Sequence, residues 1–137
     1  MMLSIVILTH NSIESIRFCL DSVFDQGVSE KEVIVVDNAS SDGTKEFVKK
    51  NYADVRLIEN PGNYGASKAR NQGIEASSGD WVLSLDSDVV LEKNFLKNFT
   101  RTATALESTA GMIQPNVLNA AGREVYSHGI RLTVFRR

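Results

Sequence analysis

The sequence predicts an α/β protein with a doubly wound, mostly parallel sheet, and two observations carry that prediction. Short apolar runs rich in β-branched residues alternate along the chain with longer segments that have the spacing of amphipathic helices. The runs at residues 5–8 and 33–36 are unbroken rather than alternating, as is typical of strands covered on both faces. Strands and helices in repeated alternation build a parallel sheet with right-handed crossovers.

Strands are expected where the apolar runs fall, at residues 3–9, 33–37, 55–59, 81–86 and 112–117. The helix after the first strand has apolar residues at helical spacing from Ile13 to Phe24, with Asn11 or Ser12 placed to cap its start. Asp42 is placed to cap the second helix. The residues that the later helices are expected to bury are Phe47 and Val48; Ala66, Ala69 and Gly73 of a helix at 65–76; and Phe95, Phe99, Ala103 and Leu106 of a helix at 93–108.

The length of 137 residues suits a single α/β domain, which we place at residues 1–118. Residues 119–137 are turn-rich and then loosely alternating, like a hairpin or an edge strand, and no closing helix follows. We therefore expect this tail to be the incomplete start of a further region, so that the fold is truncated. Strand edges around residues 112–135 would then be uncovered, which predicts self-association into homo-oligomers.

Composition excludes several classes of protein. With 15 basic and 17 acidic residues the formal net charge is -2, whereas a nucleic-acid binder usually has a basic excess. Cys19 is the only cysteine, which rules out an intrachain disulfide. No apolar stretch reaches the ~20 residues of a transmembrane helix, and the N-terminal run lacks the basic start of a signal peptide. We expect a cytoplasmic protein with no nucleic-acid partner.

Polar residues gather just after the expected strands. In an open parallel sheet, ligands bind at the carboxyl ends of the strands. The first strand ends in Thr9, followed by His10 and Asn11, while the second ends in Asp37 and the fourth in Asp86. Any one of these can be a capping or turn residue, but together they would face one edge of the sheet. This edge is the candidate site.

Asp86 and Asp88 flank Ser87 directly after the strand at 81–86. Two carboxylates at this spacing offer hard oxygen ligands of the kind that Mg²⁺ and Mn²⁺ prefer, with the remaining positions left to water and phosphate. The bare D-x-D pattern is common by chance, but its position after a buried strand favours a metal site. A metal there could neutralise charge on a diphosphate leaving group.

The loop at 60–65 opens the third helix. It is no P-loop, because the Gly-Lys-Ser/Thr ending is missing. The free amides of a helix start favour an anion, and Lys68 and Arg70 follow, although both can equally be solvated surface charges. Asp37 can accept hydrogen bonds from a ribose or a base edge, or cap the turn after it. His128 stays without an assignment.

Four blocks resemble, in order and spacing, the signatures of family 2 glycosyltransferases with the GT-A fold. They are SIVILTHN at residues 4–11, EVIVVDNASSDGT at 32–44, NYGASKARNQGI at 63–74, and GDW at 79–81 with LDSD at 85–88. The match runs from residue 3 to about residue 118, the N-terminal, nucleotide-sugar-binding portion of such an enzyme.

The resemblance implies an inverting hexosyltransferase of the kind that serves cell-envelope polysaccharide biosynthesis. A UDP-sugar is the favoured donor, with dTDP- and GDP-sugars as alternatives, and the acceptor can be a glycan, a lipid or another molecule. The full-length protein could work at the inner face of the membrane. By position in the motifs, Thr9, Asn11 and Asp37 would hold the nucleoside; Gly65, Lys68 and Arg70 would lie along the uracil, ribose or diphosphate; Asp86 would contact ribose or metal; and Asp88 would ligate Mn²⁺ or Mg²⁺.

One departure concerns the general base. The family places this acidic residue in a later, acceptor-side segment, which in this register falls beyond residue 137. Glu92 and Glu107 belong to an expected helix and Glu124 to the tail, so none of them suits the role. General-base help is worth roughly 10²–10⁴-fold. The isolated chain is therefore expected to bind the donor with weak or no transfer.

Three other interpretations stay open from the residues alone. A nucleotidyltransferase would have a glycine-rich, arginine-bearing loop after the first strand, which residues 9–12 lack. A phosphoacceptor receiver domain would have a lysine late in the chain, but none follows Lys97. A catalytically silent nucleotide-binding or interaction module remains compatible with the missing base.

Overall fold

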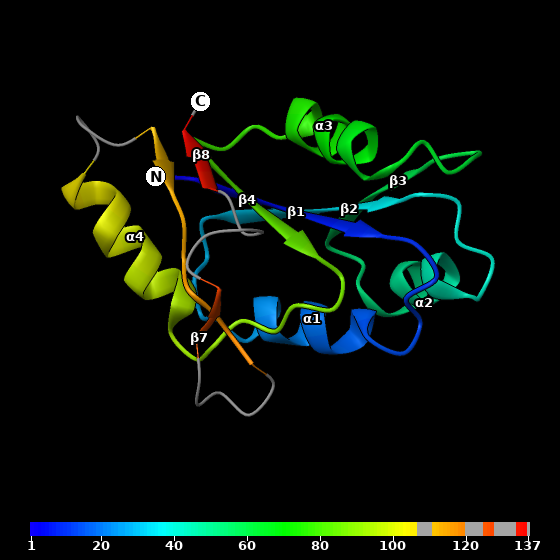
Figure 1. Cartoon of the computed structure of the whole chain (residues 1–137), viewed down its shortest axis with the longest axis horizontal. Helices are drawn as coiled ribbons and strands as arrows, with labels where there is room; N and C mark the ends of the chain where they lie inside the picture. The colour runs from blue at the N-terminus through cyan, green and yellow to red at the C-terminus, as the bar shows by residue number, and fades with distance from the viewer. Residues whose placement is uncertain (107–110, 120–124, 128–133, 137) are drawn as a thin grey trace.

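The computed structural model describes residues 1–106, 111–119, 125–127 and 134–136. Its main sheet has six strands in the order β3-β2-β1-β4-β8-β5, and β6 and β7 pair separately. Strands and helices alternate from β1 to α4, as the sequence predicts (Figure 1). The bounds are β1 Leu3–Thr9, α1 Ile16–Phe24, β2 Lys31–Asp37, α2 Thr44–Asn51, β3 Val55–Glu59, α3 Ala66–Ala76, β4 Trp81–Asp86, α4 Phe95–Ala105, β5 Met112–Ile113, β6 Val117–Leu118, β7 Val125–Ser127 and β8 Val134–Arg136.

The strands β1 to β4 are parallel, and their carboxyl ends lie level. Thr9 of β1 pairs with Asp37 of β2, which in turn pairs with Glu59 of β3. On the other side of β1, Leu8 pairs with Asp86 of β4. Polar residues that are far apart in the sequence therefore meet at one edge of the sheet, as expected. β8 and β5 extend the sheet beyond β4 in antiparallel pairs.

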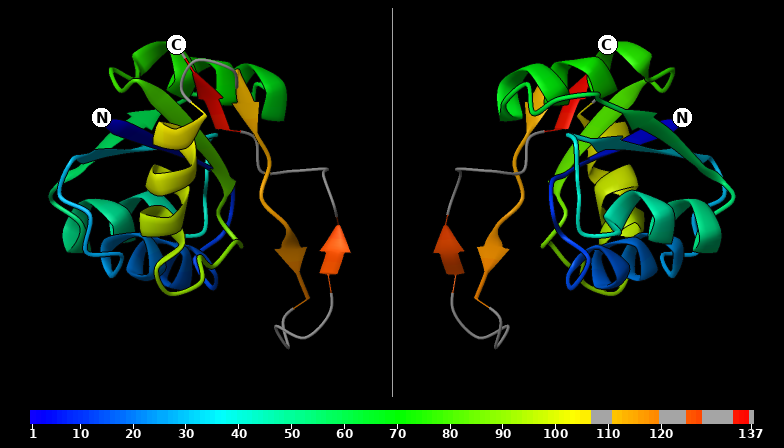
Figure 2. Two further views of the ribbon diagram at one scale, coloured as in Figure 1. Left: turned by 90° about the vertical axis from the view of Figure 1, so that its left-hand side faces the viewer. Right: turned by 90° about the vertical axis from the view of Figure 1, so that its right-hand side faces the viewer.

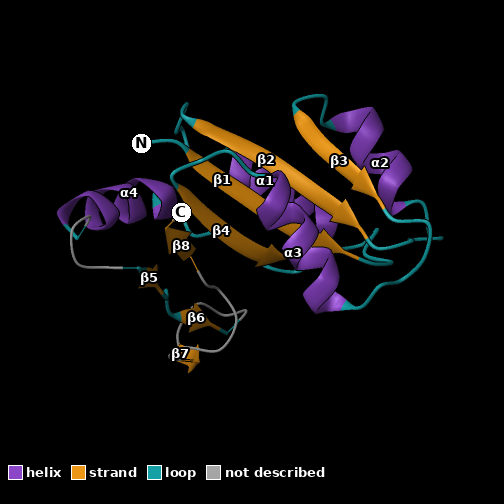
Figure 3. Ribbon diagram, turned by 90° about the horizontal axis from the view of Figure 1, so that it is seen from above, coloured by secondary structure: helices purple, strands orange, loops and turns teal. Residues whose placement is uncertain are grey.

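Helices cover both faces of the sheet, which confirms the doubly wound, mostly parallel architecture. α1, α2 and α4 lie on one face and α3 on the other (Figures 1 and 3). The face under α1 and α4 holds most of the core, with Leu3, Ile5, Ile7, Trp81, Leu83 and Leu85 against Ile16, Leu20, Leu96 and Phe99. The face under α3 holds a smaller cluster built on Val6, Ile34, Val36, Val82 and Ala69.

α3 lies unusually close to the sheet because of Gly73. A Cβ placed on Gly73 would stand 2.3 Å from Val6 Cγ1, closer than real Cβ contacts come, and 3.1 Å from Val36 Cγ2, a tight contact. The expected small face of this helix is confirmed at Ala69 and Gly73, which are buried, whereas Ala66 is exposed. Close packing fixes the height of α3 over β1 and β2, and with it the side chains near its start.

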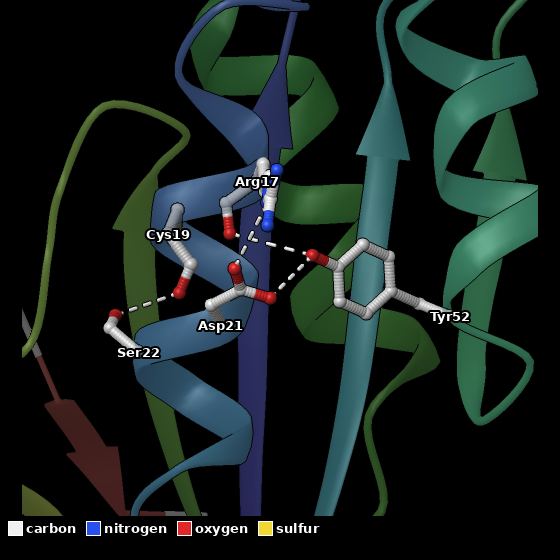
Figure 4. Close-up of polar contacts among 5 residues, drawn as sticks. All are labelled: Arg17, Cys19, Asp21, Ser22 and Tyr52. Atoms are coloured by element: carbon white, nitrogen blue, oxygen red, sulfur yellow. Dashed lines mark hydrogen bonds and ion pairs between the residues drawn. The ribbon is translucent and has the colours of Figure 1, made fainter.

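α1 is joined to the end of α2 by polar contacts on the outer surface (Figure 4). The Tyr52 hydroxyl donates to Asp21 Oδ1 at 2.8 Å, and Arg17 Nε contacts the other oxygen of the same carboxylate at 3.3 Å. Ser22 Oγ donates to the Cys19 carbonyl at 2.7 Å. The Cys19 side chain is buried under α1, with Sγ 3.7 Å from the Asp86 carbonyl.

The start of the first helix differs from the expectation. α1 begins at Ile16, and neither Asn11 nor Ser12 caps it. Asn11 has a positive φ of 50°, and its carboxamide turns toward the loop after β2. Asp42 contacts the start of α2 as expected, although one residue before the formal cap: its Oδ1 accepts from the backbone of Thr44 at 3.0 Å.

Two later elements are also corrected. The strand expected at 112–117 is broken into β5 and β6, because Pro115 lies between them and has no backbone N–H for a ladder. In α4 the inward stripe is Leu96, Phe99 and Ala103, while Leu106 follows the helix and is exposed. The positive φ of Asn94 places the helix start at Phe95, which sets this phase.

The tail is described only in part. β6 and β7 form a small antiparallel sheet that stands to one side of the main body (Figure 2). The described residues do not include Glu107, Glu124 or His128, and of the turn expected around 119–122 they include only residue 119. The boundary at residue 118 stays a prediction. In the described segments, no helix combines the length and hydropathy needed to cross a bilayer.

Candidate functional site

Thr9 and Asp37 lie side by side at the carboxyl ends of β1 and β2. Both are buried, and Asp37 Oδ2 accepts from the backbone N–H of Ser40 at 3.0 Å. Thr9 Oγ1 and Asp37 Oδ1 have no hydrogen-bond partner within the described part of the chain. Buried polar atoms are nearly always paired, so two unpaired oxygens on neighbouring strands indicate a place where a ligand supplies the partners.

Asn11 joins the loop after β1 to the loop after β2. Its backbone N–H donates to Ser40 Oγ at 2.9 Å, and its Oδ1 accepts from the backbone of Ser41 at 2.8 Å. Both loops contain a residue in the left-handed region, Asn11 itself with φ 50° and Ala39 with φ 65°. Asn11 therefore shapes the edge next to Thr9 and Asp37.

Asp86 and Arg70 form an ion pair across the edge. Arg70 Nη2 of α3 donates to Asp86 Oδ1 at 2.6 Å, and the side chains of both residues are 31% exposed. The sequence placed both near the donor, and the structure brings them together. One oxygen of Asp86 is thus engaged by a cation of the protein itself.

Asp88 is exposed two residues beyond the end of β4. The structure gives its carboxylate no hydrogen bond or ion pair to any residue it describes. Across the same residues, no group of three or more His, Cys, Asp or Glu side chains could hold a metal ion unaided. This donor set fits Mg²⁺ or Mn²⁺ bound by Asp88, with Asp86 beside it, if water and phosphate oxygens complete the shell.

A wide cleft of about 820 Å³ opens over this edge. It runs between the loop after β1, the turn before α2 and the segment after β4. Its lining consists of Leu8, His10, Asn11, Ser12, Ile13, Glu14, Ser15, Ser41, Asp42, Asp86, Ser87 and Asp88. The expected rim residues His10, Asn11, Asp86 and Asp88 therefore share one cleft, whereas Thr9, Asp37, Lys68 and Arg70 lie outside its lining.

Gly65 and Lys68 stand at the start of α3. Gly65 has φ 80°, a conformation that favours glycine, and directly precedes the helix. Lys68 Nζ lies 4.2 Å from the centroid of the Tyr64 ring, within the range of a cation–π contact. Both Tyr64 and Lys68 are exposed, so the ammonium remains available to an anion.

The sequence reasoning assigned no role to a group of amide side chains beside Asp37. Asn38, Asn60, Asn63 and Gln72 are hydrogen-bonded to one another over the loop at 60–65. Asn38 and Asn60 directly follow β2 and β3, so the rule that places Asp37 at this edge places them there too, but it does not indicate their pairing. Gln72, in the middle of α3, carries no such signal.

The carboxyl edge of this α/β sheet thus brings together two oxygens that have no partner among the described residues, a carboxylate pair and a basic helix start. The chain belongs to glycosyl transferase family 2, whose family model matches residues 4–125. Among curated relatives, it is similar to the glycosyltransferase AglE of Haloferax volcanii, with 35% identity over 130 residues. That alignment covers 88% of this chain and 43% of AglE.

Solved structures agree with the family and with the GT-A fold. S. aureus TarS 1-349 in complex with UDP-GlcNAc matches with a TM-score of 0.82 and 30% identity, over 93% of this chain and 37% of that one. The mannosyltransferase PcManGT from Pyrobaculum calidifontis, in complex with GDP-Man and Mn²⁺, matches with a TM-score of 0.80 at 23% identity, over 98% of this chain and 44% of that one. The chain thus spans less than half the length of these proteins.

Proposed function

We propose that this chain is the donor-binding part of an inverting glycosyltransferase, which transfers a hexose from a nucleotide-diphosphate sugar to a glycan, a lipid or another acceptor. The observation that carries the proposal is the pair of buried, unpaired oxygens, Thr9 Oγ1 and Asp37 Oδ1. A nucleoside offers N–H and O–H donors of the kind that this pair requires. The membership of family 2 supports the same function.

The other residues have roles along the donor. Asn11 shapes the nucleoside end of the site through its bonds to residues 40 and 41. Lys68 and Arg70 provide positive charge near the start of α3, on the side where the diphosphate would lie, while Gly65 lets the chain turn into the helix. A UDP-sugar is the favoured donor, supported by the likeness to TarS in complex with UDP-GlcNAc, and dTDP- and GDP-sugars are the alternatives.

Asp88, with Asp86 beside it, would hold Mn²⁺ or Mg²⁺. The bound metal would offset the negative charge of the diphosphate as it leaves. The acidic general base for the acceptor hydroxyl is proposed to lie beyond residue 137, so this chain alone binds the donor and transfers it weakly or not at all. The same proposal has two further parts. The protein is cytoplasmic, with the full-length form at the inner membrane face, and it self-associates through its sheet edges.

The test is a thermal-shift titration of UDP, dTDP, GDP and ADP, each with and without Mn²⁺. A ligand specific to the folded state stabilises it by about 2.7 kcal/mol at a hundredfold excess over Kd. We expect one nucleotide to raise Tm in a Mn²⁺-dependent way, and Asp88→Asn to abolish that dependence.

Asp54→Asn is the matched control. Asp54 is exposed and lies just before β3, at the opposite end of the sheet, so the variant removes the same charge away from the site. It should respond like the unchanged protein. If no nucleotide changes Tm, the proposal is wrong. If a nucleotide binds but the protein carrying its acceptor-side region transfers no sugar, the chain is a silent binding module instead.

A further inference from the structure

The amide group beside Asp37 links the end of β2 to the start of α3. Asn38 Nδ2 donates to Asn63 Oδ1 at 2.7 Å, and Asn38 Oδ1 accepts from the backbone of Tyr64 at 3.0 Å. Asn63 Oδ1 also accepts from the backbone of Gly65 at 2.9 Å. Asn38 is only 3% exposed, so its amide is buried at the inner end of these contacts, whereas Asn63 is exposed.

The orientation of these amides follows from their backbone partners. A backbone N–H can only donate, so the groups facing Tyr64 and Gly65 must be the oxygens of Asn38 and Asn63. The amino group of Asn38 then points at Asn63. Asn60 completes the arrangement, because its Nδ2 donates to Asn38 Oδ1 at 3.1 Å and to Gln72 Oε1 at 2.9 Å.

A continuous path therefore runs from the nucleoside end of the site to the ion pair. Asn38 follows Asp37 and holds residues 63–65; the Gly65 carbonyl accepts from Ala69 N in the first turn of α3; and Arg70 comes next. Gln72 adds a second tie, since it exchanges two hydrogen bonds with Asn60 at 2.9 and 3.0 Å. Arg70 then reaches Asp86 at 2.6 Å.

We propose that Asn38 is a positioning residue, which sets the placement of Arg70 against Asp86 by fixing the loop at 60–65. The effect on nucleotide binding rests on the proposed function, because it assumes a nucleoside diphosphate beside Arg70. Asn38 directly follows β2 and makes its side-chain bonds to residues of the 60–65 loop, so it acts through that loop.

Asn38→Ala removes the three hydrogen bonds that the Asn38 side chain makes to Asn60, Asn63 and Tyr64. We expect it to raise the Kd for UDP about tenfold, the effect of losing roughly 1.4 kcal/mol of binding free energy. Asn38→Asp keeps the acceptor for Tyr64 and Asn60 but loses the donor to Asn63 Oδ1, which still has to accept from the Gly65 backbone. The aspartate should therefore restore only part of the affinity.

Asn63→Asp is the control for the added charge. Its carboxylate can still accept from Asn38 and Gly65, and it places one negative charge in the same loop. We expect Asn63→Asp to bind UDP more tightly than Asn38→Asp, because it adds the same charge and keeps the bond between residues 38 and 63. A Tm for each ligand-free variant separates loss of affinity from loss of folding.

A double-mutant cycle tests the path itself. If Asn38 acts through Arg70, Asn38→Ala should change Kd by less than about threefold once Arg70→Ala is present, because effects along one path are not additive. Gln72→Ala, from the second tie, should show a smaller loss with the same non-additivity. This variant keeps the test decisive should Asn38→Ala fail to fold.

A measurement without ligand separates this inference from the proposed function. The side-chain Nε–H resonance of Arg70 in a ¹H–¹⁵N spectrum should move in Asn38→Ala and Gln72→Ala and return part of the way in Asn38→Asp. An unmoved resonance, or additive effects on Kd, would overturn the positioning role. If none of the tested nucleotides bound the unchanged protein, the proposed function would be overturned, while the resonance would still decide the role of Asn38.

Discussion

Arg70 and Asp86 are 16 residues apart in the sequence, and their side chains meet at 2.6 Å across the carboxyl edge of the sheet. The contact joins α3 to β4, two elements that flank the candidate site from different layers. It also gives Asp86, at the end of β4, a different environment from Asp88. Asp86 is held by a cation of the protein, whereas Asp88 is exposed on the cleft.

Replacing Arg70 by alanine should affect ligand binding more than folding. The ion pair is about one-third exposed, and surface pairs of this kind contribute about 0–1 kcal/mol. We expect urea denaturation to show a loss of at most about 1 kcal/mol, while the Kd for UDP rises clearly. A loss of several kcal/mol with unchanged Kd would show that the pair is purely structural.

Gly73→Ala should destabilise the protein even though alanine is the better helix former. The new Cβ would stand 2.3 Å from Val6 Cγ1, so α3 must move away from the sheet. Overpacking of this kind costs about 1–3 kcal/mol, more than the roughly 1 kcal/mol gained in helix propensity. Asn71→Ala, at an exposed position of the same helix, should be neutral or slightly stabilising. Chemical denaturation of both variants decides it, and a stable Gly73→Ala would contradict the close packing.

Ala39→Gly should stabilise the protein. Ala39 has φ 65°, and the left-handed region costs a non-glycine residue about 1–2 kcal/mol. Glycine relieves this strain but adds freedom to the unfolded chain, so the net gain should be about 0.5–1 kcal/mol. Ala105→Gly, at the end of α4, should be destabilising instead. Thermal unfolding of the pair tests the sign, and a lower Tm for Ala39→Gly would count against strain in this loop.

Alkaline pH should weaken the fold through Cys19 and Tyr52. Burial, with Asp88 and Asp86 nearby, raises the Cys19 pKa from 9.0 to about 12, so the folded state holds this proton more tightly than the unfolded chain. Stability is therefore full below pH 9.0 and is lost as pH rises toward 12, by up to about 1.4 kcal/mol per pH unit. Burial and the hydrogen bond to Asp21 raise the Tyr52 pKa from 10.0 to about 12, which adds a smaller, solvent-screened share.

Urea denaturation between pH 7 and 11 measures this loss. Tyr52→Phe is a useful comparison, because the ring keeps its stacking on Phe24 while the titrating hydroxyl is gone. The variant should lose stability less steeply above pH 10. A flat stability profile up to pH 11 would show that neither proton is retained on folding.

The architecture was predictable because its signals are local. The strands at 3–9, 55–59 and 81–86 were expected with the bounds that the structure shows, since each is an apolar run ended by polar residues. The first helix was expected too early because its apparent cap, Asn11, bonds residues 40 and 41 instead. Whether Asn11 caps the helix or bonds the other loop depends on a contact between residues 30 positions apart, which a local sequence pattern cannot indicate.

The placement of the candidate residues was predictable, but their pairings were not. Thr9, Asp37 and Asp86 were expected at one edge because the ends of parallel strands meet there, and the structure places them at that edge. That Arg70 would bind Asp86, or that Asn38 would reach Asn63, could not be read from the sequence. Such pairings depend on how high α3 lies above the sheet, which the packing of Gly73 determines.

The position of β1 has a consequence for synthesis of the chain. β1 is made first but lies between β2 and β4, so one of its edges stays unpaired until residues 81–86 have left the ribosome. Parallel pairing over such a separation forms slowly, and an open apolar edge can pair with another chain in the meantime. The nascent protein therefore passes through a stage in which β1, which is buried in the finished fold, has an open edge that can pair with another chain.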